Sequence, residues 1–202
     1  MSEFIAVILI TILAVMSPGA DFAIVTQNSY LYGRKIGIFT AAGIACGVLL
    51  HVIYTLIAIF FFLQYTSHFL NLIKFIGAIY LIYIGYKTFT QEPIQQSKSF
   101  NLISVYQAIR YGFLTNALNP KTTLFVISTY TQIVSISTPT IILIGYGLFM
   151  GFAHFVWFAL VSIVFSSKAL RKKMLDSQVF VNKVIGIILC ILGCSLLFTH
   201  FN

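Results

Sequence analysis

Long apolar runs alternate with short polar or basic segments along most of the chain. Six such runs are found, and they cover residues 4–32, 36–63, 69–89, 104–134, 141–165 and 180–198. Most of them match or exceed the roughly 20 residues that a helix needs to cross a bilayer. The pattern therefore predicts an all-α, polytopic membrane protein with six transmembrane helices. The whole chain, residues 1–202, is expected to form a single transmembrane domain.

The composition agrees with a protein that is surrounded largely by lipid. Hydrophobic residues make up 59% of the 202 residues and charged residues only 8%, whereas about a quarter of a soluble domain is charged. The formal net charge is +8. The basic residues fall mainly in short loops between apolar runs, which is typical of a topology signal and not of a nucleic-acid-binding face. We therefore expect the lipid bilayer as a partner and no nucleic acid.

Positive charge in the loops predicts the orientation of the chain in the membrane. Lys and Arg gather after the first, third and fifth runs, at Arg34, Lys35, Lys87, Lys98, Arg110 and a cluster from Lys168 to Lys173. The loops after the second and fourth runs contain neither residue type. The positive-inside rule then makes the three basic loops cytoplasmic, including the predicted loop from Lys168 to Lys173. Both termini are predicted to be extracytoplasmic, in a cell membrane that the chain crosses several times.

The two halves of the chain resemble each other, as repeat one over about 1–90 and repeat two over about 104–202, joined by a loop at about 90–103. The corresponding features are Pro18 with Pro120, Gly43 and Gly47 with Gly147 and Gly151, and Lys74 to Gly77 with Lys183 to Gly186. Each half holds three helices, an odd number, so the second copy is expected to be inverted. Inverted repeats are typical of transporters whose central site opens alternately to each side. The glycine pairs favour close helix packing, either within the chain or in a homodimer.

The first helix of each half is interrupted by a polar residue and a proline. Ser17–Pro18 and Asn119–Pro120 each resemble a helix start, in which a capping side chain precedes proline at the first helical position. A helix that starts inside an apolar run presents free N–H groups and a positive dipole end, and two such ends facing each other would bind an anion such as an amino-acid carboxylate. The alternative is a proline kink, which membrane helices tolerate. The candidate substrate-binding residues at these breaks are Ser17, Pro18, Gly19, Asn119 and Pro120.

Each break also carries an ionisable residue, Asp21 in the first half and Lys121 in the second. A charge at the centre of a bilayer costs about 3 kcal/mol, so it is usually paired or functional. Asp21 is the only acid within the six apolar runs, and it is a candidate for binding a substrate amine or for carrying a coupling proton. Lys121 is a candidate for attracting a carboxylate. The alternative is a static Asp21–Lys121 ion pair that fixes the two halves together.

Two histidines occupy similar places in the two halves. His51 lies one turn beyond Gly47, and His154 lies just under one turn beyond Gly151. This near-symmetry makes both candidates for proton coupling beside Asp21, although a membrane histidine often only hydrogen-bonds a neighbouring helix. The three cysteines lie inside apolar runs, where a role as small apolar filler is expected. We therefore predict no metal site and no cofactor.

In their order and spacing, these motifs resemble the LysE-type amino-acid exporters, also called the RhtB family. The resemblance covers essentially the whole chain. The chain differs from the family at Ala20, where many relatives have a second proline. The absence of this proline would soften the first break. The residues that carry the resemblance are Ser17-Pro18-Gly19-Ala20-Asp21, Gly33-Arg34-Lys35-x-Gly37 with Gly43 and Gly47, Lys74-x-x-Gly77-Ala78-x-Tyr80-Leu81 with Gly85, and Asn119-Pro120-Lys121 with Gln132.

The resemblance implies an exporter of amino acids or close derivatives in the cytoplasmic membrane, driven by the proton gradient. Its partners would be a small-molecule substrate and protons. Other cargoes, such as a metal cation or an amine, and a membrane-embedded enzyme are the alternatives. No enzymatic activity is expected. Ser17 has no evident base partner for nucleophilic catalysis. An intramembrane aspartyl protease needs two aspartates, and the second one here, Asp176, lies in the basic segment.

Overall fold

The computed structural model describes residues 2–62, 75, 78–79, 82–83, 85–90, 103–133 and 138–199. This part of the chain is helical and contains no strand, so the predicted all-α fold is confirmed. The third predicted run, 69–89, and the loop after it lie largely outside the described residues. The bounds of the helices are α1 (Ser2–Met16), α2 (Ala20–Tyr32), α3 (Arg34–Phe62), α5 (Val105–Ala117), α6 (Pro120–Ile133), α7 (Thr140–Ser166) and α8 (Lys168–Thr199).

Length and composition single out up to three candidate membrane spans among the described residues. Arg34–Phe61 and Thr140–Ser166 are each long and apolar enough to cross a bilayer, and α1 with α2 counts as a third span that is bent by 55° at the break. The runs predicted at 104–134 and 180–198 are also helical, but they do not pass this test. The architecture of six spans in two inverted repeats stays a prediction.

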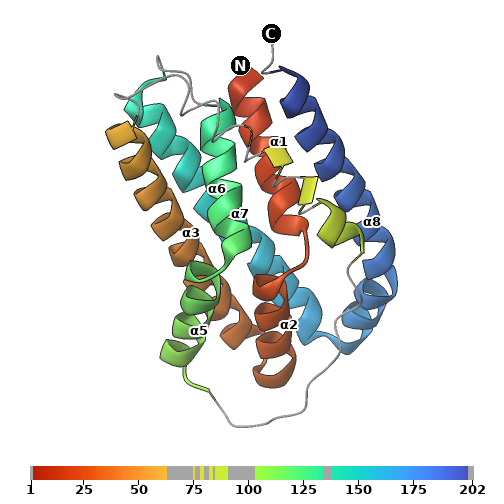
Figure 1. The fold of residues 1–202 in the computed structure, drawn as a ribbon. Coiled ribbons are helices and arrows are strands. Elements are labelled where there is room, and N and C mark those ends of the chain that lie inside the picture. Colours follow the sequence, from red (N-terminus) through yellow and green to blue (C-terminus); the bar gives the residue numbers. More distant parts are fainter. Residues whose placement is uncertain are drawn as a thin grey trace.

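The two broken helices run in opposite directions through the molecule. In Figure 1, α1 and α2 descend from the end at which α1 begins, whereas α5 and α6 ascend towards it. Helix α8 ends at the same end of the molecule at which α1 begins. Opposite directions for the two broken pairs are what an inverted repeat requires.

Small residues bring the helices of this chain close together. Helix α3 packs against both α5 and α7. A Cβ atom added to Gly43 would lie 2.1 Å from the carbonyl oxygen of Ile109, and one added to Gly112 would lie 2.0 Å from that of Thr40. At these positions only glycine allows the backbones of α3 and α5 to approach this closely. These glycines therefore pack helices within the chain, and a homodimer stays a prediction.

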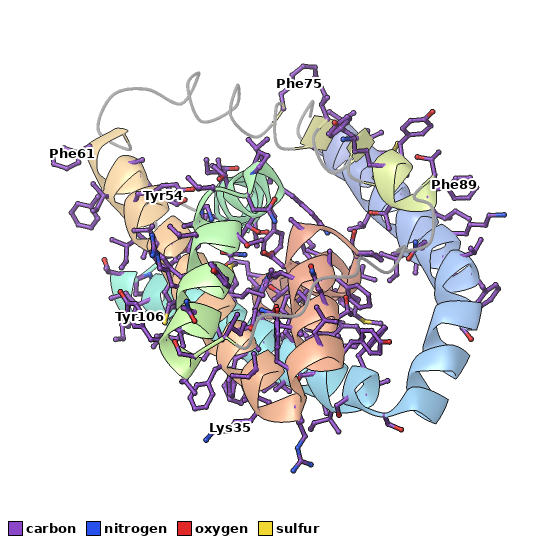
Figure 2. All side chains as sticks on the ribbon, turned by 90° about the horizontal axis from the view of Figure 1, so that it is seen from below. Lys35, Tyr54, Phe61, Phe75, Phe89 and Tyr106 are labelled. Carbon is purple, nitrogen blue, oxygen red and sulfur yellow. The ribbon has the colours of Figure 1, made fainter. Side chains whose placement is uncertain are left out.

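The outer surface of the bundle carries many large apolar side chains. Phe61 is 70% exposed and Phe152 is 65% exposed, and Figure 2 shows Phe61 at the outer edge of α3. A soluble monomer rarely exposes extended apolar surface, whereas a surface facing lipid is expected to be apolar. Figure 2 also shows Lys35 at the opposite end of α3 from Phe61, pointing away from the bundle.

The loop predicted from Lys168 to Lys173 is wrong, because these residues form the first turns of α8. Ser167 alone separates α7 from α8, and its backbone is extended (φ −98°, ψ 124°). The segment after it is rich in Lys, Arg, Ala, Leu and Met, which are strong helix formers. Helical propensity continues through the basic cluster, so charge alone did not mark a loop there.

Candidate substrate site between the helix breaks

The first break lies between Ser17 and Ala20. The N–H of Ser17 still donates to the carbonyl of Leu13 (3.1 Å), so the hydrogen bonding of α1 continues to Ser17. Pro18 has no N–H with which to extend this ladder. Gly19 is extended (φ −177°, ψ −161°), and α2 begins at Ala20.

The predicted helix start at Ser17–Pro18 is therefore wrong. The N-cap of α2 is Gly19, which makes no side-chain capping bond. The hydroxyl of Ser17 instead hydrogen-bonds to the hydroxyl of Thr88 (2.5 Å). Gly19 therefore supplies no side-chain cap to the first N–H groups of α2.

The second break is a capped helix start, as predicted. Helix α5 ends at Ala117 and α6 begins at Pro120. The side-chain Oδ1 of Asn119 accepts a hydrogen bond from the N–H of Lys121 (3.0 Å), which is the usual geometry of an N-cap. Asn119 therefore caps the start of α6, whereas Gly19 provides no side-chain cap for α2, so the two helix starts differ.

The ionisable residue of each break bonds to the other break. Lys121 Nζ donates to the carbonyl oxygens of Ser17 (2.5 Å) and Pro18 (3.4 Å), just beyond the C-terminal end of α1. Asp21 Oδ2 accepts from Asn119 Nδ2 (3.2 Å) and from Asn116 Nδ2 (2.8 Å). These reciprocal bonds join the two halves of the chain at their breaks.

The predicted alternative of a direct Asp21–Lys121 ion pair is not what the structure shows for these two residues. Both hydrogen-bond to neutral amide or carbonyl groups. The charge of Lys121 still acts on Asp21 electrostatically, although the two do not bond. A ligand with one positive and one negative charge would therefore find an oppositely charged residue for each of them, Asp21 and Lys121.

A small cavity lies between the two breaks. Its volume is about 20 Å³, which is room for about one water molecule. Asp21 is only 7% exposed, and its Oδ1 is buried without a hydrogen-bond partner among the residues that the structure describes. The polar residues that line the cavity are Ser17, Asp21, Asn119, Lys121, Thr122 and His154, and the aromatic ones are Phe22, Phe125 and Phe158.

A second, larger cavity of about 570 Å³ adjoins the first. Gly19, Asn119 and Lys121 line both cavities, while Lys87 and Thr90 line only the larger one. Volumes of this order suit small-molecule ligands. The structure therefore combines a small chamber that holds charged, polar and aromatic side chains with a roomier space that reaches the same lysine.

The structure separates the two histidines. His154 lines the small cavity, and its Nδ1 donates to the carbonyl of Met150 one turn earlier in α7 (2.8 Å). His51 is fully buried, and its Nε2 donates to the carbonyl of Asn116 (2.8 Å). Its Nδ1 faces the hydroxyl groups of Tyr54 and Thr123. Of the two histidines, only His154 lines the small cavity, whereas His51 bonds to Asn116, which in turn bonds to Asp21.

The main residue that sequence reasoning missed is Asn116, which contacts Asp21 from the last turns of α5. It is completely buried. The signal that could have found it is its spacing, because Asn116 lies three residues before Asn119 inside the apolar run 104–134, next to the second break. Asn116 near the end of α5 and Asn119 at the start of α6 both donate to Asp21 Oδ2.

A charged polar chamber between two broken helices, inside a bundle with an apolar outer surface, defines the chain as a helical membrane transporter. The chain belongs to the LysE type translocator family, whose model matches residues 12–200. The family resemblance noted in the sequence is thereby confirmed. No solved structure gives a significant match.

Several relatives are similar over most of the chain. The membrane protein YrhP of Bacillus subtilis is 30% identical over 94% of this chain and 95% of its own length. The threonine efflux protein of Escherichia coli is 26% identical over 84% of each chain. The leucine efflux protein of Salmonella choleraesuis is 26% identical over 63% of this chain and 61% of its own length.

Proposed function

We propose that this chain exports an amino acid or a close derivative across the cytoplasmic membrane by secondary, proton-coupled efflux. Membership of a translocator family and the names of the threonine and leucine efflux relatives support amino-acid cargo. The observation that carries the proposal is the buried Asp21, with a free oxygen in a chamber that Lys121 also lines. A zwitterion supplies one partner for each charge.

In the proposed bound state, the substrate ammonium group binds Asp21 Oδ1. The carboxylate binds Lys121 and the uncapped N-terminus of α2. A Cβ atom added to Gly19 would lie 3.6 Å from Lys121 Nζ, so the ammonium group of Lys121 is adjacent to the cap position of α2. A lysine beside free backbone N–H groups is a favourable carboxylate site.

The proposed coupling follows from competition for one carboxylate. A proton and a substrate ammonium group cannot both occupy Asp21 Oδ1, so release of one accompanies binding of the other. His154 lines the same chamber and is the second candidate for the coupling proton, while His51 lies behind Asn116 and is the third. Such exclusive occupancy allows an inward proton gradient to drive outward export.

The chamber in this structure is too small for an amino acid, so transport requires it to enlarge and open. The larger cavity reaches Lys87, which lies on the side predicted to be cytoplasmic. We propose that cargo enters from that side, meets Lys121 first and then reaches Asp21 as the breaks separate. Alternating access of this kind is typical of transporters built from two halves.

Purified protein in liposomes tests the proposal. The panel consists of labelled amino acids, including threonine and leucine, with a simple amine and a divalent cation as alternative cargoes, under an imposed pH gradient. We expect gradient-dependent flux of at least one amino acid and its loss in Asp21→Asn. Glu3→Gln, which neutralises an acid near the start of α1, is the matched control. Absence of amino-acid flux, or normal flux in Asp21→Asn, would contradict the proposal.

A further inference from the structure

Asn116 makes both of its side-chain N–H bonds inside the protein. Nδ2 donates to Asp21 Oδ2 (2.8 Å) and to Thr122 Oγ1 (3.1 Å). The ionised carboxylate of Asp21 can only accept hydrogen bonds, so the nitrogen of the amide, and not its oxygen, must face it. The second N–H of the amide needs an acceptor as well, and Thr122 provides it. Thr122 therefore holds the amide in the orientation in which its nitrogen faces Asp21.

Helix α3 holds Asn116 from the opposite side. His51 Nε2 donates to the main-chain carbonyl of Asn116 (2.8 Å). A Cβ atom added to Gly47 would lie 2.7 Å from Asn116 Oδ1 and 2.8 Å from its Cβ. Asn116 thus has little room to move towards α3, and His51 fixes the backbone that carries it.

These contacts distribute the two oxygens of Asp21 unequally. Two neutral amides, from Asn116 and Asn119, bond Oδ2, whereas Oδ1 is buried with no partner. A buried carboxylate oxygen without a donor is costly. Because the amides are neutral, the charge of Asp21 stays available to a cation at Oδ1.

We infer that Asn116 is a positioning residue, which clamps one oxygen of Asp21 so that the other is presented to the ammonium group of the cargo. The inference rests on the proposed function, and it makes recognition of the α-amino group the task of Asn116, Asp21 and Thr122 together. Asn116 itself does not touch the cargo.

Competition transport assays test this role. Each variant in liposomes transports a labelled amino acid from the panel, and the unlabelled amino acid and its 2-hydroxy-acid counterpart compete. The ratio of their half-inhibitory concentrations measures how strongly the ammonium group is preferred. We expect Asn116→Leu to lower this preference about tenfold or more, since misplacing a binding group by about 1 Å is costly. Thr122→Val removes the second acceptor of the Asn116 amide but keeps Asn116 itself, so it is expected to lower this preference less.

Asn28→Leu is the matched control. Asn28 is a buried asparagine on the same helix as Asp21, and its Nδ2 donates to Thr40 Oγ1 (2.9 Å), away from the chamber. We expect Asn28→Leu to retain the wild-type preference, whatever its effect on stability. An unchanged preference in both Asn116→Leu and Thr122→Val, or the same loss in Asn28→Leu, would overturn the inference.

A double-mutant cycle of thermal unfolding in detergent separates this inference from the proposed function. The loss of Tm caused by Asn116→Leu is expected to fall by at least half when Asp21 is already replaced by leucine, because the contact is then absent. Additive effects would refute the clamp even if transport is normal. A wild-type protein that transports no amino acid would refute the proposed function, while the cycle still decides whether Asn116 positions Asp21.

Discussion

Asp21 and Lys121 connect the two broken helices through neutral partners. Lys121 Nζ bonds to the carbonyl of Ser17, and Asp21 Oδ2 bonds to the amides of Asn116 and Asn119. A substrate carboxylate at Lys121 must replace its bonds to the first break. In the proposed mechanism, binding of cargo would therefore loosen the contacts that hold the two breaks together.

Lys121→Met keeps most of the side-chain length and removes the charge. We expect the KM for amino-acid transport to rise about tenfold or more, because a charge-assisted hydrogen bond contributes about 1.5–3 kcal/mol. Thermal stability should also fall, since the carbonyl of Ser17 loses its donor. Initial rates over a range of substrate concentrations give the KM, and a fluorescence-based melt gives the Tm.

Lys87→Met is the matched control for this prediction. Lys87 is exposed and lines only the larger cavity. The Lys87→Met variant is expected to change the KM by less than Lys121→Met does, and to leave the Tm close to the wild-type value. Equal effects of the two variants would show that general positive charge, and not the position of Lys121, attracts the cargo.

Phe125 limits the size of the cargo if the substrate side chain lies against the aromatic wall of the chamber. It is 4% exposed and lines the small cavity. Phe125→Leu is expected to raise the leucine-to-threonine transport ratio, and Phe125→Ala to raise it further, by about tenfold. Phe152→Leu, on the exposed face of α7, should leave the ratio unchanged. A ratio that does not respond to either Phe125 variant would place the side chain elsewhere.

The charged residues of the site were predictable from sequence, whereas the amide that holds Asp21 was not. A charge within an apolar run has a high cost, so Asp21 and Lys121 stand out without any structure. Asn116 lies 95 positions from Asp21, and an uncharged side chain carries no comparable penalty. Ser17 misled the prediction because the extended Gly19 moves the start of α2 to Ala20.

At the level of the helices, glycine decides how closely α3 and α5 approach. We expect Gly43→Ala to lower stability by about 1–3 kcal/mol, because its methyl group would overlap the carbonyl of Ile109. Gly145→Ala is the matched control, since nothing lies within 4 Å of its Cβ position on α7. It should be neutral or slightly stabilising, as alanine favours helix over glycine. Thermal melts in detergent compare the two, and equal destabilisation would contradict the role assigned to Gly43.

The helices themselves were easier to predict than their ends. Apolar runs gave α3 and α7 to within a few residues, because lipid requires every backbone polar group to bond inside its own helix. The start of α8 was missed because Lys and Arg serve both as topology signals and as good helix formers. A basic cluster indicates which side of the membrane a segment faces, but it does not indicate whether that segment is a helix or a loop.

For the whole molecule, three groups of basic residues lie on helices that begin at one end of the bundle. Helices α3, α5 and α8 all begin at the end of the bundle opposite to the start of α1 (Figure 1). Arg34 and Lys35 stand at the start of α3, Arg110 lies in α5, and the cluster from Lys168 begins α8. The fold thus brings three separate stretches of positive charge to one end of the bundle, which the positive-inside rule predicts to be cytoplasmic.

Cysteine accessibility tests this orientation. In a variant that lacks Cys46, Cys190 and Cys194, single cysteines replace Lys35 and Phe61, which are exposed and stand at opposite ends of α3 (Figure 2). A membrane-impermeant maleimide added to intact cells is expected to label Phe61→Cys and to leave Lys35→Cys unlabelled until the membrane is opened. The reverse pattern would place the positive end outside. It would also reverse the direction in which the larger cavity beside Lys87 supplies cargo, so this measurement decides whether the proposed entry side is right.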